Sequence, residues 1–360
     1  MKLKYTYSLF LLLNIGILAA QDTPKLMAHE LNVEQFWRGC FGARRGARSE
    51  YSGSYINDEQ QSMATKETAK KVKHLVREPL YIFQLNLFLE KKKKVFMLLQ
   101  GKRGVIFGAL DEQSIAWKVA EKCVANGATI TLSNAPVAMR FGKINELGER
   151  LNAQIIPADA TIVEDLENVF TGAQEALGGK LDFVLHSIGM SLNVRKGKHY
   201  TDLNYEWMLK TFDISAVSFH KMLQTLMKTD AMNDWGSVLA LTYIAAQRVF
   251  PDYNEMAESK ALLESIARSF GYHYGTQKKV RVNTISQSPT WTTAGSGVKG
   301  FQEFFDYADK MSPLGNADAD ACADYCVAMF SDLTKMVTMQ NLFHDGGFST
   351  MGMNPAVLGL

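Results

Sequence analysis

The feature that most constrains the fold is a regular alternation, from Gly101 onward, of short apolar runs with longer amphipathic stretches. Short buried strands that alternate with helices form β-α units, and their strands pair in parallel. The pattern predicts an α/β fold with a doubly wound parallel sheet of seven strands and helices on both faces. The expected strands are Arg103–Phe107, Ala128–Leu132, Ile155–Ala158, Phe183–His186, Ser237–Thr242, Val280–Ile285 and Gln340–His344.

The amphipathic stretches between these runs predict long helices. We expect them over Ser114–Asn126, Asn204–Lys228, Tyr253–Tyr274 and Ala319–Phe330. Doubly wound sheets of this Rossmann type bind ligands beyond the carboxyl ends of their strands. The residues that directly follow the expected strands are therefore the first candidates for a functional site, in a single domain over residues 97–360.

The first 96 residues lack this regularity. Residues 1–20 place two lysines before an apolar run, which is the layout of a secretory signal, although the run is too short for an ordinary transmembrane helix. Residues 21–96 show no period and no group of chemically active side chains. We expect an N-terminal extension over residues 1–96, partly disordered, that adds nothing to the domain.

Composition excludes several classes of function. A chain with 47% hydrophobic and 21% charged residues is typical of a soluble globular protein, and a formal charge of +2 gives no support for binding nucleic acid or an acidic membrane. The four cysteines are too few and too scattered for a disulfide framework. Cys322 and Cys326 lack partners that would complete a metal site, so we expect no metal and two small core residues.

The turn after the first expected strand is a candidate nucleotide site. It begins at Gly108 and leads into a helix at Ser114 and Ile115. A glycine here lets the backbone approach a pyrophosphate, and the helix offers free N–H groups and the positive end of its dipole. The turn lacks the three glycines of the common dinucleotide fingerprint, and a simple tight turn would also explain Gly108.

Other strand ends add candidates for the same site. Asp159-Ala160 follow the third expected strand and Ser187-Ile188-Gly189 the fourth. The second strand ends at Ser133-Asn134, where neither an acid for the ribose hydroxyls nor an arginine for a 2′-phosphate stands. The residues alone therefore leave NADH and NADPH open.

Three side chains form a candidate catalytic group. Tyr253 and Lys260 are seven residues apart, which on a helix places both on one face. A lysine ammonium lowers the pKa of a nearby tyrosine, which then donates to an oxygen that becomes negative as hydride arrives. An ordinary amphipathic helix would also contain such a pair. Tyr243, ten residues before Tyr253, ends the fifth expected strand in the same crevice, whereas Ala240 replaces the serine of many short-chain reductases.

The spacing of these three residues resembles that of a known family. Tyr243, Tyr253 and Lys260 match the Tyr-x9-Tyr-x6-Lys pattern of bacterial-type enoyl-acyl-carrier-protein reductases, of the short-chain dehydrogenase/reductase superfamily. The resemblance runs from about Gly101 to Met353. Further matching segments are Gly108 to Ala116, His186 to Gly189, Asp213 to Ser215, Arg281 to Asn283 and His344 to Phe348.

The resemblance implies hydride transfer from NADH, less readily from NADPH, to the β-carbon of a trans-2-enoyl thioester. It implies that Tyr253 bonds the thioester carbonyl, that Lys260 holds the nicotinamide ribose, and that Tyr243 and Met256 line the acyl site with Tyr253. It also implies a mobile lid that begins at residues 289–292. The cofactor contacts it implies are Gly108, Ser114, Ile115, Asp159, Ala160, Ser187, Ile188, Gly189, Lys260, Pro289, Thr290 and Thr292.

Partners follow from the same resemblance: acyl carrier protein as the carrier of the substrate, a homotetramer, no nucleic acid and no stable association with a membrane. The sequence departs from the family after the lid, where basic residues often meet the acidic carrier. Here Lys299 is followed by Gln302 and Glu303. The bulky Trp291 either narrows the acyl entrance or only caps the lid.

Alternatives remain at this stage. A carbonyl–alcohol oxidoreductase shares the fold, but Ala240 and the absence of Tyr-x-x-x-Lys disfavour it. A nucleotide-sensing module without catalysis also shares the fold, but it has no need of Tyr243, Tyr253 and Lys260 together. Since export conflicts with such an enzyme, residues 1–96 are either an organelle-targeting leader, which implies a stroma, or a mis-assigned reading frame before Met97, which implies the cytoplasm. The acidic residues of the extension favour the second hypothesis.

Overall fold

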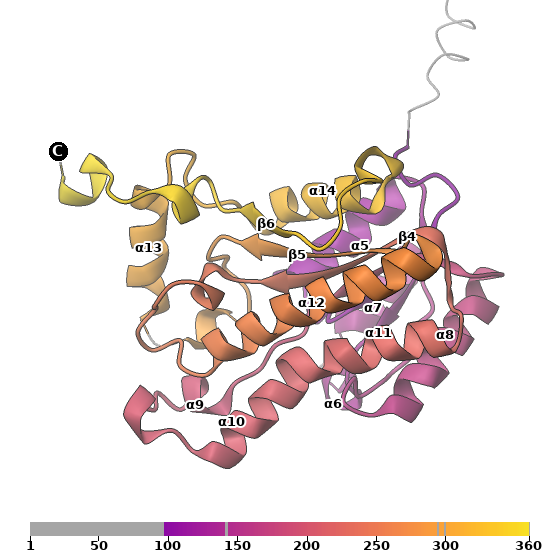
Figure 1. The fold of residues 1–360 in the computed structure, drawn as a ribbon, viewed down its shortest axis with the longest axis horizontal. Coiled ribbons are helices and arrows are strands. Elements are labelled where there is room, and N and C mark those ends of the chain that lie inside the picture. The colour runs from indigo at the N-terminus through magenta and orange to yellow at the C-terminus, as the bar shows by residue number, and fades with distance from the viewer. Residues whose placement is uncertain (1–96, 141–142, 294, 299, 360) are drawn as a thin grey trace, which may run out of the picture. The chain divides into compact units, whose positions relative to one another are not determined.

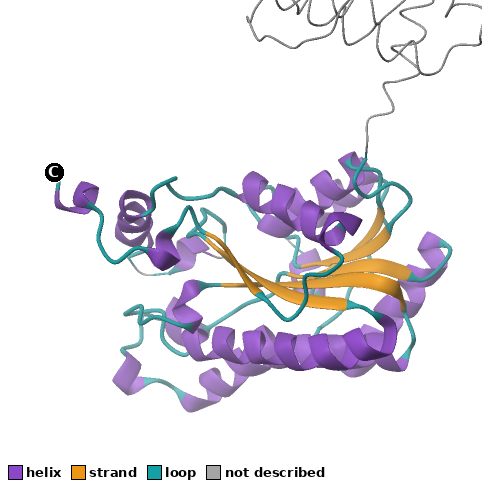
Figure 2. Ribbon diagram, turned by 45° about the horizontal axis from the view of Figure 1, so that its top comes forward, coloured by secondary structure: helices purple, strands orange, loops and turns teal. Residues whose placement is uncertain are grey.

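The computed structural model describes residues 97–140, 143–293, 295–298 and 300–359. Within them, six parallel strands form one sheet in the order β2-β1-β3-β4-β5-β6, with helices on both faces (Figures 1 and 2). The doubly wound α/β fold is thereby confirmed. The strands are β1 (Arg103–Phe107), β2 (Thr129–Ser133), β3 (Leu181–His186), β4 (Met232–Thr242), β5 (Arg281–Gln287) and β6 (Asn341–His344).

Helices connect the strands and extend the domain beyond the carboxyl ends of the sheet (Figure 1). The α-helices are α5 (Ile115–Ala125), α6 (Pro136–Met139), α7 (Lys143–Leu151), α8 (Val163–Leu177), α9 (Leu192–Arg195), α10 (Tyr205–Phe212), α11 (Ser218–Lys228), α12 (Met256–Lys278), α13 (Phe301–Met311) and α14 (Ala319–Phe330). The shorter turns are η1 (Tyr200–Asp202), η2 (Asp213–Val217), η3 (Ile244–Ala246), η4 (Gly295–Gly297), η5 (Asp332–Thr334), η6 (Phe348–Thr350) and η7 (Pro355–Leu358). Among the described helices, none is long and apolar enough to cross a bilayer.

The two faces of the sheet carry two separate cores. Successive side chains of a strand point to opposite faces, so Ile106 of β1 packs with α5, α7 and α14, whereas its neighbours Val105 and Phe107 pack with α8, α11 and α12. Cys322 and Cys326 are fully buried free thiols in the first core, as expected of core residues.

The expected seventh strand, Ile155–Ala158, is absent as a strand, and this prediction is wrong. The segment runs beside β2, but Leu132 and Ile155 form only one isolated parallel bridge. Ile156 N donates to Leu132 O at 2.9 Å and Ala158 N to Asn134 O at 3.0 Å, but β2 ends at Ser133, so these bonds do not continue into a ladder of paired residues. The sheet therefore has six strands, with this segment as an irregular border.

The expected helix over Asn204–Lys228 is interrupted. The π-helix η2 separates α10 from α11 without ending the helical path. Single π-turns inside helices occur frequently at functional sites. Here the π-turn carries Ser215, whose Oγ accepts from Met190 N at 2.9 Å, so it fixes the loop that follows β3.

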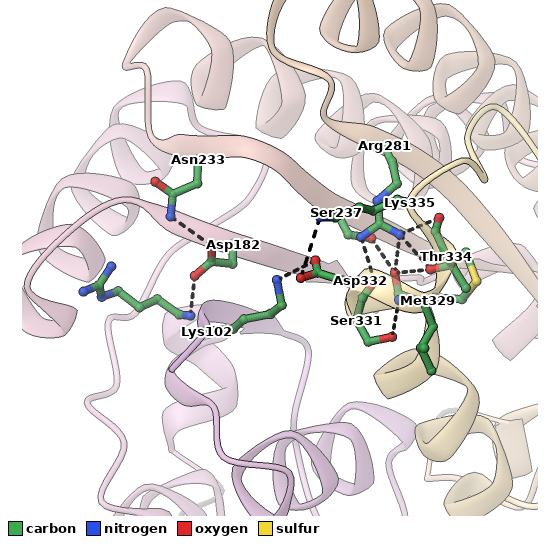
Figure 3. Close-up of polar contacts among 12 residues, drawn as sticks. Lys102, Asp182, Asn233, Ser237, Arg281, Met329, Ser331, Asp332, Thr334 and Lys335 are labelled. Atoms are coloured by element: carbon green, nitrogen blue, oxygen red, sulfur yellow. Dashed lines mark hydrogen bonds and ion pairs between the residues drawn. The ribbon is translucent and has the colours of Figure 1, made fainter. Parts of the chain in front are cut away.

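Polar side chains at the amino edge of the sheet donate to backbone carbonyls at the end of α14, as Figure 3 shows. Arg281, which is 2% exposed, donates from Nη1 to Met329 O at 3.0 Å and from Nη2 to Ser331 O at 3.2 Å, and so caps the carboxyl end of α14. Ser237 Oγ donates to the same Met329 carbonyl at 3.0 Å. This edge is a closed hydrogen-bonded structure that secures α14 to the sheet.

Candidate active site

The turn after β1 requires glycine. Gly108 has a φ of +96°, and a Cβ built there would lie 2.0 Å from Ser187 O. Any side chain would collide with the backbone that follows β3, so the two strand ends lie in contact. The residues present therefore fit a site where a pyrophosphate approaches the backbone.

The amino terminus of α5 stays open toward that turn. Ser114 occupies the cap position without capping the helix, because its Oγ accepts from Leu110 N at 3.2 Å and donates to Asp111 O at 2.6 Å. Ile115 opens the helix behind it, so its first N–H groups and the positive end of the dipole face the turn. Thr293 also donates to Asp111, which joins the lid segment to this turn.

The remaining expected cofactor positions follow the irregular segment beside β2 and the strand β3. Asp159 Oδ1 accepts from both the backbone N and the Oγ1 of Thr161, at 2.9 and 2.7 Å, and Ala160 beside it is 7% exposed. Ser187 N donates to Phe107 O at 3.3 Å. A Cβ built on Gly189 would lie 3.7 Å from Lys260 Nζ, so the chain after Ile188 passes directly beside that ammonium.

Lys260 is a buried cation at the carboxyl edge. It is 8% exposed, and its Nζ donates to Leu241 O at 2.8 Å. Burial lowers its pKa to about 8, while Glu264, one helical turn further along α12, acts in the opposite direction. His186, at the end of β3, is held neutral because burial and the charge of Lys260 lower its pKa to about 3.

Tyr253 does not share a helix face with Lys260, which corrects the expectation. α12 begins at Met256, and Asn254 takes a left-handed φ of +47°, which breaks any helix between Tyr253 and Met256. Burial raises the pKa of Tyr253, and Lys260 is bonded to Leu241 instead of contacting the phenol. Tyr253 therefore remains a protonated hydrogen-bond donor rather than a lysine-stabilised phenolate.

Tyr243 leads from β4 into an aromatic cluster. Its ring centroid lies 5.3 Å from that of Tyr253, 5.2 Å from Phe250 and 5.7 Å from Phe304. Its buried Oη has no hydrogen-bond partner within the described residues. Ala240, at the position of the serine in many short-chain reductases, is fully buried in the core below. The arrangement provides one apolar wall with two phenols at its inner end.

Glu255 is a site residue that the sequence reasoning missed. It is fully buried, and its Oε1 accepts from Ser191 Oγ at 2.6 Å, Thr211 Oγ1 at 2.9 Å and Asn193 Nδ2 at 3.2 Å. The carboxylate thus ties the turn that carries Tyr253 to the loop after β3 and to α10. The sequence contained one signal for Glu255, namely its carboxyl side chain at a position between the candidate catalytic residues Tyr253 and Lys260.

Glu264 is a second missed residue, on the α12 face next to Lys260. Its Oε1 accepts from Thr242 Oγ1 at 3.0 Å and Asn341 Nδ2 at 3.1 Å, and its Oε2 accepts from Gln247 Nε2 at 3.1 Å. Burial raises its pKa. The four-residue spacing from Lys260 was the signal for a helical charge pair.

The lid segment starts from a fixed base. Pro289 is buried, Thr290 Oγ1 accepts from Gln287 Nε2 at 3.1 Å, and Thr292 Oγ1 accepts from Gly295 N at 2.9 Å. Trp291 is 45% exposed and its ring lies 4.7 Å from that of Phe301, so it packs on the outer side of the aromatic cluster rather than within it. Met256, expected in the acyl site, is buried at the start of α12.

Comparisons with known proteins show the family of this chain. A family model described as enoyl-(acyl carrier protein) reductase matches residues 108–349. The enoyl-[acyl-carrier-protein] reductase [NADH] 1 of Rhizobium meliloti is 33% identical over 71% of this chain and 93% of its own length. The FabI–NADH complex of Alistipes finegoldii is 62% identical, with a TM-score of 0.72 over 73% of this chain and 93% of that chain. A Bacillus cereus enoyl-acyl carrier protein reductase, solved with NADP+ and indole naphthyridinone, is 29% identical, with a TM-score of 0.67 over 71% and 99%. The chain therefore belongs to the enoyl-(acyl carrier protein) reductase family.

Proposed function

We propose that this enzyme reduces the trans-2 double bond of enoyl thioesters carried by acyl carrier protein, with NADH as hydride donor, in the elongation cycle of fatty-acid synthesis. The observation that carries the proposal is the ring contact between Tyr243 and Tyr253, with centroids 5.3 Å apart, in a member of this family whose Lys260 is held at the end of the neighbouring strand by Leu241 O. A sensor needs the nucleotide pocket but has no use for the two phenols.

Tyr253 serves as the donor to the thioester carbonyl. Because burial raises its pKa, its hydroxyl keeps its proton across the working pH range. A protonated phenol donates to the carbonyl oxygen, and this bond strengthens as the oxygen gains enolate charge. Tyr243, whose buried Oη lacks a partner in the described part of the chain, lies within ring contact and lines the acyl site with Met256.

The cofactor fits the residues at the strand ends. NADH, when bound, supplies the hydride. Gly108 and the amino terminus of α5, with Ser114 and Ile115, would hold its pyrophosphate. Lys260, beside Gly189, would hold the nicotinamide ribose. Further expected contacts come from Asp159, Ala160, Ser187, Ile188, Pro289, Thr290 and Thr292.

NADH is the preferred nicotinamide. The carboxyl end of β2 offers no cation beside the adenosine ribose: Asn134 follows the strand, and its Nδ2 is engaged with Ala109 O at 2.8 Å. Arg140 ends α6 with an exposed side chain. If kcat/KM were higher with NADPH, Arg140 or another basic residue would bind the 2′-phosphate, and a shift of the preference toward NADH in Arg140→Ala would identify Arg140.

The physiological partners are acyl carrier protein and three further copies of this chain, with no nucleic acid and no stable membrane association. The working compartment is the cytoplasm, or an organelle stroma if residues 1–96 are a targeting leader. Light scattering of the purified protein tests the tetramer, and a monomer would refute it.

The direct test measures NADH oxidation by the purified protein with a medium-chain trans-2-enoyl thioester and, separately, with a 3-ketoacyl thioester. We expect turnover of the enoyl substrate and none of the ketone, because Ala240 supplies no hydroxyl to polarise a ketone. Preference for the 3-ketoacyl substrate would assign a carbonyl reductase instead. Binding of NADH without any turnover would assign the sensor.

A further inference from the structure

The two walls of the candidate site differ in charge. Figure 1 shows α9 and α13 at the same end of the sheet, beyond the carboxyl ends of the strands. On one side, Arg195, Lys196 and Lys198 lie within a stretch that contains no acidic residue between Asp182 and Asp202. We call residues 195–199 the basic turn.

The opposite wall is acidic. Helix α13 follows the lid and exposes Glu303, Asp306 and Asp309 against a single cation, Lys310. Gln302 stands beside Glu303, so the first turn of this helix has no positive side chain. An acidic partner would be repelled by this face.

The basic turn is an ordered structure. Ser191 Oγ accepts from Val194 N at 3.0 Å, and Lys198 N donates to Asn193 O at 3.0 Å, so the backbone path is closed by hydrogen bonds. Gly197 takes the left-handed φ of +60° that the reversal needs. A fixed backbone presents its charged side chains in a defined direction, which a docking surface requires.

The basic turn is also joined directly to the catalytic turn. Asn254 Nδ2 donates to Lys198 O at 2.8 Å, and Asn254 is the neighbour of Tyr253. Asn193, just before the basic turn, donates to Glu255 at 3.2 Å. The basic turn therefore borders the residues that meet the thioester.

Two of its cations are available to a partner. Arg195 and Lys196 are exposed, and no ion pair joins either of them to a residue in the described part of the chain. Lys198 is partly buried and pairs with Asp202 at 3.5 Å. Exposed charges at the rim of a site raise the association rate of an oppositely charged partner.

We propose that acyl carrier protein docks on the basic turn, through Arg195 and Lys196, rather than on helix α13. This inference rests on the proposed function, since it assigns the surface that receives the carrier. An acidic carrier that delivers its acyl group to Tyr253 meets attraction on this wall and repulsion from Glu303 on the other.

The test compares two substrates with the same trans-2-enoyl group: one on purified acyl carrier protein and one on N-acetylcysteamine, which is small and uncharged. In the full-length chain, Arg195→Glu with Lys196→Glu should lower kcat/KM for the carrier substrate about tenfold, mainly through KM. It should leave kcat/KM for the small thioester unchanged. Added salt should depress the wild-type rate with the carrier and affect the variant much less.

The matched control is Lys228→Glu with Lys279→Glu. Both lysines are exposed at the opposite edge of the sheet, and this pair of substitutions changes the net charge by the same amount as the tested pair. This control should keep wild-type kinetics with both substrates. Glu303→Lys should raise kcat/KM for the carrier substrate by removing repulsion. If Arg195→Glu/Lys196→Glu retained wild-type kcat/KM with the carrier, or lost turnover of both substrates equally, the proposal would be overturned. A wild-type enzyme that turned over neither substrate would instead refute the proposed function.

Discussion

The two edges of the sheet differ in whether their buried polar groups have hydrogen-bond partners. At the amino edge, Arg281 and Ser237 donate to backbone carbonyls at the end of α14, and of these two side chains only Nε of Arg281 has no partner within the described residues (Figure 3). At the carboxyl edge, buried atoms of Tyr243, His186 and Glu255 have no partner within the described residues. An unpaired buried polar atom costs free energy. We therefore infer that bound ligands supply hydrogen-bond partners at the carboxyl edge.

The largest expected effect is on catalysis at the carboxyl edge. Tyr253→Phe removes the donor to the developing enolate and keeps the ring contact with Tyr243. We expect kcat to fall about 100- to 1,000-fold, which corresponds to about 2.7–4 kcal/mol. The melting temperature should stay close to that of the wild type. Turnover within threefold of wild type would show that Tyr253 is not the donor.

The matched change at the amino edge should reverse the pattern. Arg281→Met keeps the apolar stem but removes the donor to Ser331 O and Thr334 O, and it leaves Met329 O with only its bonds from Ser237 and Thr334. We expect a loss of about 2–4 kcal/mol in the free energy of unfolding, measured with urea. Turnover per folded molecule should be unchanged at a permissive temperature. If Arg281→Met lowered turnover without lowering the free energy of unfolding, the amino edge would have a catalytic role, which contradicts the proposed difference between the edges.

The dependence of kcat/KM on pH tests the role of Lys260 at the carboxyl edge. The pKa of Lys260 is about 8, so its ammonium loses its proton as the pH rises through that value, and its hold on the ribose weakens. We expect kcat/KM for NADH to fall about tenfold per pH unit above this point. His186, with a pKa of about 3, and the tyrosines, whose pKa values are raised, do not titrate there.

Lys260→Arg provides the control, because a guanidinium keeps its charge in this range. The alkaline limb should disappear or move to higher pH in this variant, even where overall activity is reduced. An unchanged limb would assign it to another group, and Glu264 beside Lys260 would be the next one to replace.

The smallest expected effect concerns residues 1–96. Leu98 packs against the first core, and Leu99 is fully buried in it. We expect a chain that starts at Met97 to match the full chain in kcat and in free energy of unfolding, within about 0.5 kcal/mol. Mass spectrometry of the native protein should find an N-terminus near Met97. Peptides from residues 21–90 in the mature, active enzyme would refute this reading.

Most of the fold was predictable because periodicity decides it. Residues 104–107 form a short run without polar side chains that is buried on both faces, and such a run predicts a parallel strand. Ile155–Ala158 reads in the same way, yet its strand character depends on how far β2 extends beside it, which is a tertiary property. The π-turn at Asp213–Val217 also leaves no trace in the apolar pattern, because the helical path continues through it.

The sequence predicts those features of the site that depend on residue type and on spacing along the chain. Tyr243, Tyr253 and Lys260 could be named from the chain, but their mutual geometry could not. The left-handed turn at Asn254 depends on a hydrogen bond to Lys198, which is distant in sequence. Glu255 was missed for the same reason, since its three donors come from two other segments.

The central claim is that the carboxyl edge alone receives the cofactor. Amide hydrogen–deuterium exchange with and without NADH tests it directly. We expect slower exchange in residues 108–116, 187–190 and 289–298 when NADH is added, and no change in residues 329–335 at the amino edge. Protection at the amino edge, or none at the first turn, would contradict the account.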